Sequence, residues 1–209
     1  MKNFEKSLRD KEERGSWVCL RCPPIRDTKE ARKKWQDFAQ DKFARLVQID
    51  RSLGGNDFLL KMRNLERFFL DAVMDSEHAI LLVGESVGGL LAKKLAREML
   101  KQRKKIVGVI TLGTAHQNIS WSELSALPMS KRMEMWLGLR ILKKLHQIPD
   151  TIDSPLISVG GEDDRRVPAH RAHPTKNSPK NWQINQPNSC HADLVGQPDR
   201  IFQQIGLLN

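Results

Sequence analysis

The sequence predicts an α/β fold built on a mainly parallel sheet of about five or six strands, with helices on both faces. Two uninterrupted apolar and β-rich runs, residues 106–112 and 156–159, are typical of strands covered on both faces. Segments with apolar residues at helical spacing alternate with such runs along the chain. A G-x-S-x-G sequence at residues 84–88 joins an apolar run to a helical segment, as a strand-to-helix turn does.

The first half of the chain has the pattern of two strand-helix units. Its four predicted elements are a strand at residues 16–21, a helix at 28–43, a strand at 46–50 and a helix at 57–74. Pro23 and Pro24 end the first strand, because proline cannot donate to a sheet ladder. Trp35 and Phe38 lie on one face of the first helix, and Phe69 belongs to the apolar stripe of the second.

The second half continues the alternation. Its predicted elements are a strand at residues 79–83, a helix from 89 to about 102, the strands at 106–112 and 156–159, and a weaker strand at 182–184. A long connection, residues 115–150, holds a basic amphipathic helix at 129–146. An ordinary crossover helix, a lid over the strand ends and a membrane-surface helix are the alternatives. As a lid, it would bring Trp121 and Trp136 to a bound substrate.

The length and composition indicate one domain in a reducing compartment. The chain has 209 residues, which we divide into a charged N-terminal leader at 1–15 and a single domain at 16–209. Neither a signal-peptide h-region nor an apolar run of membrane-spanning length occurs, so we expect a cytoplasmic protein. The three cysteines leave one unpaired in any intramolecular disulfide scheme, which agrees with that compartment.

The net charge of +10 is distributed over several segments rather than concentrated in one. Lysines and arginines cluster around residues 32–34, 93–105 and 131–144, each in a segment that resembles the solvent face of a helix. No groove-reading or base-stacking motif accompanies them, so we do not expect a nucleic-acid partner. Peripheral contact with an anionic membrane surface, an acidic substrate and a plain solubilising surface remain alternatives.

Cys19 and Cys22 form a C-x-x-C sequence that invites a metal or redox interpretation. A zinc site would need two more ligands, for which Cys190 and His191 are the nearest candidates in type. A second well-spaced pair is missing, and Cys19 falls in an apolar run. Buried or incidental thiols are therefore the preferred interpretation, and we expect no metal.

Ser86 is the central residue of the G-x-S-x-G sequence and the predicted nucleophile. A serine hydroxyl needs a base within hydrogen-bond reach and an acid that orients the base. Asp163 and Asp164 follow the strand that ends near residue 159, and His191 lies in a polar loop before the last helix. The other histidines that compete for the role of base are His116, His170 and His173.

With these residues the chain resembles the α/β-hydrolase superfamily. The order Ser86, Asp164, His191 is the order of that superfamily, and residues 161–168 match its acid loop, G-x-x-D-x-x-V-P, which favours Asp164 over Asp163. Residues 191–195 are similar to its histidine loop. Residues 111–116 resemble, weakly, a segment of lipases and of inositol-deacylase-like relatives. The resemblance implies a small serine esterase or lipase-like member that needs no cofactor.

The chain departs from that superfamily where an early His-Gly pair normally precedes one donor of the oxyanion hole. Residues 21–25 read Arg-Cys-Pro-Pro-Ile instead, and proline has no N–H to donate. We expect the Val87 N–H as one donor. The second would come from the N–H of Cys22 or Ile25, or from the Arg21 side chain. The chain is also too short for the opening antiparallel strands of the superfamily.

The function predicted on this basis is hydrolysis of carboxylic esters, including lipid or other acyl esters, through a Ser-His-Asp triad and an acyl-enzyme. The partner is then a small-molecule or lipid acyl ester. One alternative is a catalytically weak binding or regulatory protein on the same fold, because of the residue 21–25 loop. Another is an acyltransferase that uses the same triad.

Overall fold

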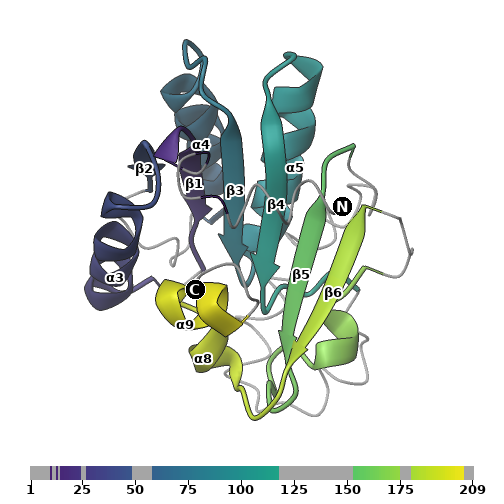
Figure 1. Cartoon of the computed structure of the whole chain (residues 1–209). Coiled ribbons are helices and arrows are strands. Elements are labelled where there is room, and N and C mark those ends of the chain that lie inside the picture. Colours follow the sequence, from purple (N-terminus) through teal and green to yellow (C-terminus); the bar gives the residue numbers. More distant parts are fainter. Residues whose placement is uncertain are drawn as a thin grey trace.

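The computed structural model describes residues 10, 13, 15–24, 27–48, 58–117, 153–174 and 180–204, with residues 58–63 and 204 described by their backbone alone. Six strands in these ranges form one parallel sheet with the order β2-β1-β3-β4-β5-β6 (Figure 1). They are β1 (Val18–Cys22), β2 (Arg45–Val47), β3 (Ile80–Glu85), β4 (Ile106–Leu112), β5 (Leu156–Gly161) and β6 (Asn181–Gln186). The predicted fold class is confirmed.

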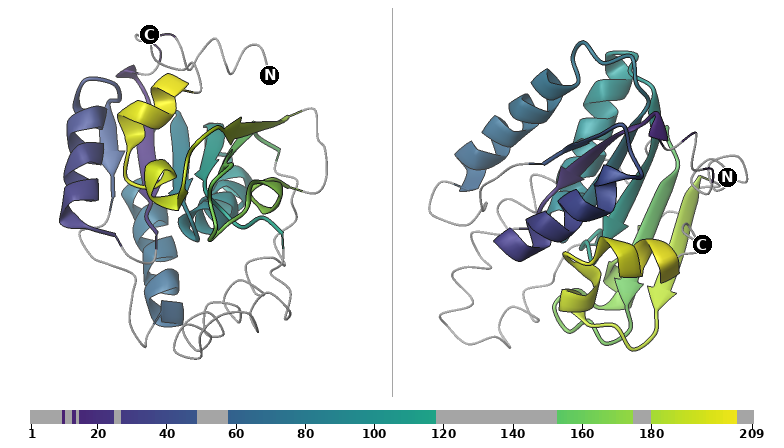
Figure 2. Two further views of the ribbon diagram at one scale, coloured as in Figure 1. Left: turned by 90° about the horizontal axis from the view of Figure 1, so that it is seen from below. Right: turned by 60° about the vertical axis from the view of Figure 1, so that its left-hand side comes forward.

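Helices cover both faces of this sheet (Figure 2). The described helices are α3 (Lys29–Gln40), α4 (Phe58–Ala72), α5 (Gly88–Lys101), α8 (His191–Leu194) and α9 (Pro198–Gln204), together with the 3₁₀ turn η1 (Ala169–Arg171). The apolar residues of α4 and α5 pack on one face, and those of α3, α8 and α9 pack on the other. Thr28 begins α3 as its N-cap, because its hydroxyl accepts the Ala31 N–H at 3.0 Å.

The alternation of side chains along β3 explains how one sequence serves two cores. Ile80 and Leu82 belong to the core under α4 and α5, whereas Leu81 and Val83 belong to the core under α3 and α9. All four side chains are fully buried. A strand covered on both faces reads as a continuous apolar run, which is why period-two alternation is absent from its sequence.

The structure ends β2 at Val47, so the strand predicted to run to residue 50 is shorter than predicted, but it extends two other predicted strands at their carboxyl ends. β3 reaches Glu85 and β5 reaches Gly161, in each case two residues beyond the predicted end. β6 is a full strand rather than a weak one, because its backbone pairs with β5 from Asn181 to Gln186 despite its polar sequence. The helix predicted at 129–146 and nearly all of the 115–150 connection lie outside the described residues.

The carboxyl ends of the strands meet at one edge of the sheet. Because all described pairs are parallel, Cys22, Glu85, Leu112, Gly161 and Gln186 end their strands on the same side. Figure 1 shows the arrowheads of β3 to β6 at this edge, with α8 beside those of β5 and β6. Loops at such an edge are where open parallel sheets bind ligands.

Candidate active site

Ser86 lies on a sharp turn between β3 and α5. Its backbone has φ of +54°, which is uncommon for a residue with a side chain and indicates a strained turn. The Ser86 N–H donates to the carbonyl of Leu112 at 2.8 Å, and the Gly89 N–H donates to the Ser86 carbonyl at 3.1 Å. These bonds tie the turn to the neighbouring strand end and to the first turn of α5. The Ser86 side chain is half-buried at the sheet edge.

The glycines on either side of Ser86 allow backbones to approach more closely than any side chain would permit. A Cβ added to Gly84 would lie 2.3 Å from the Cα of Gly89, and one added to Gly88 would lie 2.2 Å from the carbonyl oxygen of Cys22. Both obstacles are backbone atoms, which cannot rotate away. The spacing of the G-x-S-x-G sequence therefore has a steric cause.

We expect Gly84→Ala to destabilise the protein by about 1–3 kcal/mol, as overpacking of a tight site does. For a chain of this size the corresponding fall in Tm is roughly 2–4 °C per kcal/mol. Gly15→Ala is the matched control, since nothing lies within 4 Å of a Cβ there. Thermal unfolding followed by circular dichroism measures both. Equal Tm values for the two variants would contradict the tight contact between β3 and α5.

Asp164 and His191 lie together at the ends of β5 and β6. His191 Nδ1 and Asp164 Oδ2 are 2.7 Å apart, and the Asp164 side chain is buried. The other carboxylate oxygen, Oδ1, accepts the backbone N–H groups of Arg166 at 2.8 Å and Val167 at 2.9 Å. These two bonds orient the carboxylate and leave Oδ2 for the imidazole. Asp163 is exposed, so the geometry favours Asp164 as the partner of His191.

The turn after β4 has contacts with both the serine and the histidine segments. Gly113 has φ of +54°, and a Cβ added to it would lie 3.1 Å from His191 Nδ1. The carbonyl of the preceding residue, Leu112, accepts the Ser86 backbone N–H. Within the described residues no hydrogen bond joins the Ser86 hydroxyl to His191. Such bonds are often long or poorly aligned in an enzyme without its substrate.

The competing histidines have other surroundings. His116 is buried with Nε2 2.8 Å from Thr111 Oγ1. His173 is buried between Ser158 and Asn185, with Nδ1 2.9 Å from the hydroxyl and Nε2 2.7 Å from the amide oxygen. His170 is exposed in η1. Two of these histidines thus bond residues other than Ser86, and the third is exposed, so none of them replaces His191 as the candidate base.

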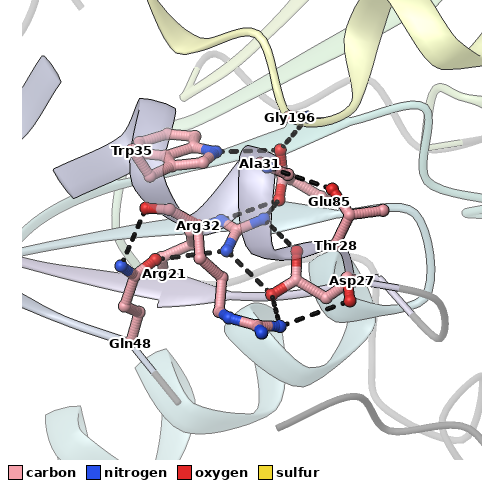
Figure 3. Close-up of polar contacts among 9 residues, drawn as sticks. All are labelled: Arg21, Asp27, Thr28, Ala31, Arg32, Trp35, Gln48, Glu85 and Gly196. Carbon is pink, nitrogen blue, oxygen red and sulfur yellow. Dashed lines mark hydrogen bonds and ion pairs between the residues drawn. The ribbon is translucent and has the colours of Figure 1, made fainter. Parts of the chain in front are cut away.

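A charged cluster surrounds Glu85, the residue that precedes Ser86 in the chain (Figure 3). Glu85, the last residue of β3, is fully buried and accepts hydrogen bonds from Arg21, Trp35 and the backbone N–H of Gly196. Arg21 in turn donates to Asp27. The sequence did not point to Glu85, Asp27 or Gly196 as part of the site, and it suggested Arg21 only as an oxyanion donor. The available signal was a charged residue at the end of an apolar strand, one in β1 and one in β3.

No protein-family model and no curated protein sequence matches the chain. Solved structures do resemble it over most of its length. An α/β-hydrolase enzyme from the metagenome of lagoon sediments at Mar Chica, Morocco, has a TM-score of 0.60 at 14% identity, covering 91% of this chain and 89% of that chain. The protein has the α/β-hydrolase fold.

Two further structures of similar shape carry more specific names. The RedJ thioesterase from the prodiginine biosynthetic pathway of Streptomyces coelicolor has a TM-score of 0.57 at 18% identity, covering 92% of this chain and 86% of that chain. The monoacylglycerol lipase of Paleococcus ferrophilus has a TM-score of 0.58 at 12% identity, covering 91% of this chain and 92% of that chain. At these identities the likeness is one of fold.

The α/β-hydrolase fold gives a place to each of the three residues described above. In this fold the nucleophile turn follows a central strand, and the acid and the histidine follow later strands in that chain order. Ser86 follows β3, Asp164 follows β5 and His191 follows β6. The first strand of the described sheet begins at Val18, and all of the described strand pairs are parallel.

The oxyanion-hole candidates of the α/β-hydrolase fold divide into three groups. Val87 follows the serine and has a helical backbone with φ of −59°, just before α5 begins. Cys22 ends β1, and its carbonyl oxygen packs against Gly88, so the loop after β1 passes beside the turn that holds Ser86. Ile25 lies outside the described residues. The two predicted substrate contacts, Trp121 and Trp136, lie outside them as well. The role of the Val87 and Cys22 N–H groups as oxyanion donors therefore stays a prediction.

Arg21 cannot serve as an oxyanion donor through its side chain, which corrects that alternative. A guanidinium has five N–H donors. Arg21 uses its donors on Glu85 through Nε at 2.8 Å and Nη2 at 2.5 Å, on Asp27 through Nη1 at 3.1 Å and Nη2 at 2.7 Å, and on Gln48 through Nη1 at 3.2 Å. No N–H remains for a substrate. The side chain is fully buried on the far side of the sheet from Gly88.

The C-x-x-C sequence does not form a metal or redox site. Cys19 belongs to the core under α3, whereas Cys22 belongs to the core under α4 and α5, on the opposite face of the sheet. Cys190 is exposed and lies in the histidine loop. Among the described residues no group of three metal-ligating side chains occurs.

The described helices also include none with the length and apolarity that a membrane crossing requires.

The three thiols are expected to differ sharply in reactivity. Burial raises the pKa of Cys19 to about 12, and it raises the pKa of the Cys22 thiol further still, so both stay protonated at pH 8. Cys190 is exposed. Titration of the native protein with a chromogenic thiol reagent should therefore give one fast equivalent, and unfolding in guanidinium should release the other two. Three fast equivalents in the native state would contradict the buried β1.

Proposed function

We propose that the protein is a serine hydrolase of acyl esters or thioesters, with Ser86 as nucleophile, His191 as general base and acid, and Asp164 as the residue that orients the imidazole. Support comes from one arrangement above all. A serine at φ of +54° after β3 and a 2.7 Å histidine-aspartate pair after β5 and β6 stand at the same edge of the sheet. The names of the thioesterase and the lipase with this fold agree with the proposed class of reaction.

The first chemical step forms an acyl-enzyme. If the Nδ1–H of His191 donates a hydrogen bond to Asp164, Nδ1 keeps its proton and the lone pair of Nε2 is available to accept the Ser86 proton. Ser86 Oγ then attacks the carbonyl carbon, and the carbonyl oxygen becomes an oxyanion. Collapse of this tetrahedral intermediate breaks the bond to the leaving group, which takes the proton from Nε2. Water repeats the sequence on the acyl-enzyme and releases the acid.

The oxyanion is proposed to accept the Val87 N–H at the start of α5. Its second donor is proposed to be the N–H of Cys22, since the loop after β1 lies beside Gly88. Pro23 and Pro24 can contribute no N–H. Loss of one oxyanion donor typically lowers kcat by about 10²–10³-fold, so this loop has a strong influence on the rate.

Turnover of p-nitrophenyl esters tests the proposal. We would measure short and long acyl chains, and acyl thioesters beside them, with the wild-type protein, with Ser86→Ala and with Ser76→Ala as the matched serine control. Ser76 lies in the turn after α4, at the opposite end of β3 from Ser86. The proposal predicts turnover that is lost in Ser86→Ala alone. Turnover that persists in Ser86→Ala would contradict it.

A second candidate function is binding without efficient turnover. Two observations favour it: the proline pair after β1 and the lack of a described hydrogen bond between Ser86 and His191. It predicts a folded wild-type protein that binds acyl compounds but turns over none of the esters or thioesters. Transfer of the acyl group to an added alcohol, measured as a new ester product, would identify the third alternative, an acyltransferase.

A further inference from the structure

The carboxylate of Glu85 connects the three segments that build the proposed site, namely the nucleophile turn, the loop after β1 and the histidine loop. Oε1 accepts the indole N–H of Trp35 at 3.0 Å and the backbone N–H of Gly196 at 2.5 Å. Oε2 accepts Nε of Arg21 at 2.8 Å and Nη2 of Arg21 at 2.5 Å. A carboxylate has about four acceptor positions, and all four are used here. Figure 3 shows these partners around the carboxylate.

Glu85 and two of its partners, Arg21 and Gly196, each adjoin a different part of the site. Glu85 immediately precedes Ser86 on β3. Arg21 is followed by Cys22, which ends β1 and begins the proposed oxyanion loop. Gly196 lies just after α8, the single helical turn that starts at His191. The nucleophile turn, the oxyanion loop and the histidine loop are thus joined through one buried side chain.

The link from Glu85 to His191 is short and stiff. The Val195 N–H donates to the His191 carbonyl at 3.2 Å and closes the turn of α8. Gly196 follows with φ of +74°, a conformation that favours glycine. A displacement of the Gly196 N–H relative to Glu85 is therefore passed to the backbone of His191.

The charge of this cluster is balanced, which explains why a glutamate can be buried there. Arg21 and Arg32 face Glu85 and Asp27, with Arg32 Nη1 3.4 Å from Asp27 Oδ2. Burial opposes the charge of Arg21, but the two carboxylates outweigh it and raise the pKa of the guanidinium above its ordinary value. A buried ion pair is weak evidence for stability, and its best-attested use is to specify one geometry.

We propose that Glu85 is a positioning residue that sets the placement of His191 relative to Ser86, through its simultaneous bonds to Gly196 and Arg21. The inference rests on the proposed function, because it assigns the geometry of that same site. Its basis is the set of four hydrogen bonds to a fully buried carboxylate beside the nucleophile.

Glu85→Gln is the sharpest substitution because it keeps the size and shape of the side chain. An amide has one oxygen, whereas its nitrogen is a donor. If the amide nitrogen faces Gly196 and Trp35, it can accept neither of their N–H groups, and the hydrogen bond that holds the histidine loop is lost. If it faces Arg21, the oxyanion loop is released. Either orientation breaks one of the two links.

Steady-state kinetics on the ester that the wild-type protein hydrolyses provide the first readout. For Glu85→Gln we expect kcat to fall by about 10–100-fold while KM changes by less than about threefold, since misplacement of reacting groups by 1 Å can lower rates about 10²-fold. Glu66→Gln is the matched control, because Glu66 pairs with Lys94 between α4 and α5, away from the three loops. A kcat for Glu85→Gln equal to that of Glu66→Gln would overturn the proposal.

A double-mutant cycle tests the specific contact. Gly196→Ala strains the positive φ and puts a Cβ 2.8 Å from the Cβ of Ala31, so it displaces the same N–H from the other side. We expect Gly196→Ala alone to lower kcat to a similar extent. The double variant should then lose little more than the worse single variant. Multiplied losses in the double variant would mean that the two residues act separately and would overturn the proposal.

A spectroscopic readout separates failure of this inference from failure of the proposed function. Protein labelled with ¹⁵N in its histidines reports the ring signals of His191 whether or not an ester is hydrolysed. We expect the His191 signals to shift or broaden in Glu85→Gln and to stay unchanged in Glu66→Gln. Signals that stay unchanged in both Glu85→Gln and Gly196→Ala would overturn the positioning role, because Gly196→Ala displaces the histidine loop whichever way the Glu85→Gln amide is turned. Absence of ester and thioester turnover by the wild type would instead count against the proposed function alone.

Discussion

Replacement of His191 with alanine is expected to lower kcat for ester hydrolysis by about 10³-fold or more while the protein stays folded. Without the imidazole, Ser86 lacks its proposed base, and the two other buried histidines of the described residues, His116 and His173, are held by other residues. His191 is only partly buried, so its removal should disturb the core little. Steady-state assays with a p-nitrophenyl ester would measure the loss of kcat.

His170→Ala is the matched control for this experiment. His170 is exposed in η1, close in sequence to Asp164 but without a bond to it. Its replacement should leave kcat within about twofold, as surface changes usually have little effect. If His191→Ala retained wild-type kcat, or if His170→Ala lost activity to the same degree, the assignment of His191 as the base would be refuted.

Arg21→Met is expected to destabilise the protein by about 3–5 kcal/mol, the range found when one partner of a buried ion pair is removed. The substitution leaves Glu85 with two empty acceptor positions and Asp27 with Arg32 as its only described ion-pair partner. For a chain of this size the fall in Tm is roughly 6–20 °C. Thermal unfolding at pH 8 would measure it.

Arg67→Met provides the contrast for a surface pair. Arg67 faces Asp71 with 86% of its side chain exposed, and such pairs contribute roughly 0–1 kcal/mol. Its Tm should stay close to that of the wild type. A Tm loss for Arg21→Met as small as that for Arg67→Met would contradict the structural role of the buried cluster.

The strands and the nucleophile turn were predictable because their causes are local. A strand with helices on both faces shows as an unbroken apolar run, as residues 106–112 do. The close approach of Gly84 and Gly88 to other backbone atoms leaves a short motif around Ser86. By contrast, the polar sequence of β6 predicted only a weak strand at residues 182–184, because its pairing with β5 along the whole length is a contact with a distant segment.

The choice between neighbouring residues in the site depended on contacts between distant segments. Asp163 and Asp164 are equivalent in composition, and only the family pattern favoured Asp164 before its 2.7 Å contact with His191 was known. Arg21 was a candidate donor to substrate until the structure showed all of its N–H groups on Glu85, Asp27 and Gln48. Those partners come from three separate stretches of the chain.

The buried role of Glu85 was hidden for the same reason. In sequence it occupies the variable position before Ser86, where any residue satisfies the motif. Its significance comes from Arg21, 64 positions earlier, and from Gly196, 111 positions later. A charged residue that ends an otherwise apolar strand is the signal to look for, because burial of a charge requires such partners.

Covalent labelling with a fluorophosphonate probe, followed by peptide mass spectrometry, tests the central claim most directly. The account predicts close to one probe per wild-type chain, attached to Ser86, and no labelling of Ser86→Ala. Labelling of His191→Ala should be much slower, because activation of the hydroxyl depends on the imidazole. A folded wild-type protein that takes up no probe, or that carries it on another residue, would contradict the assignment of Ser86 as the nucleophile.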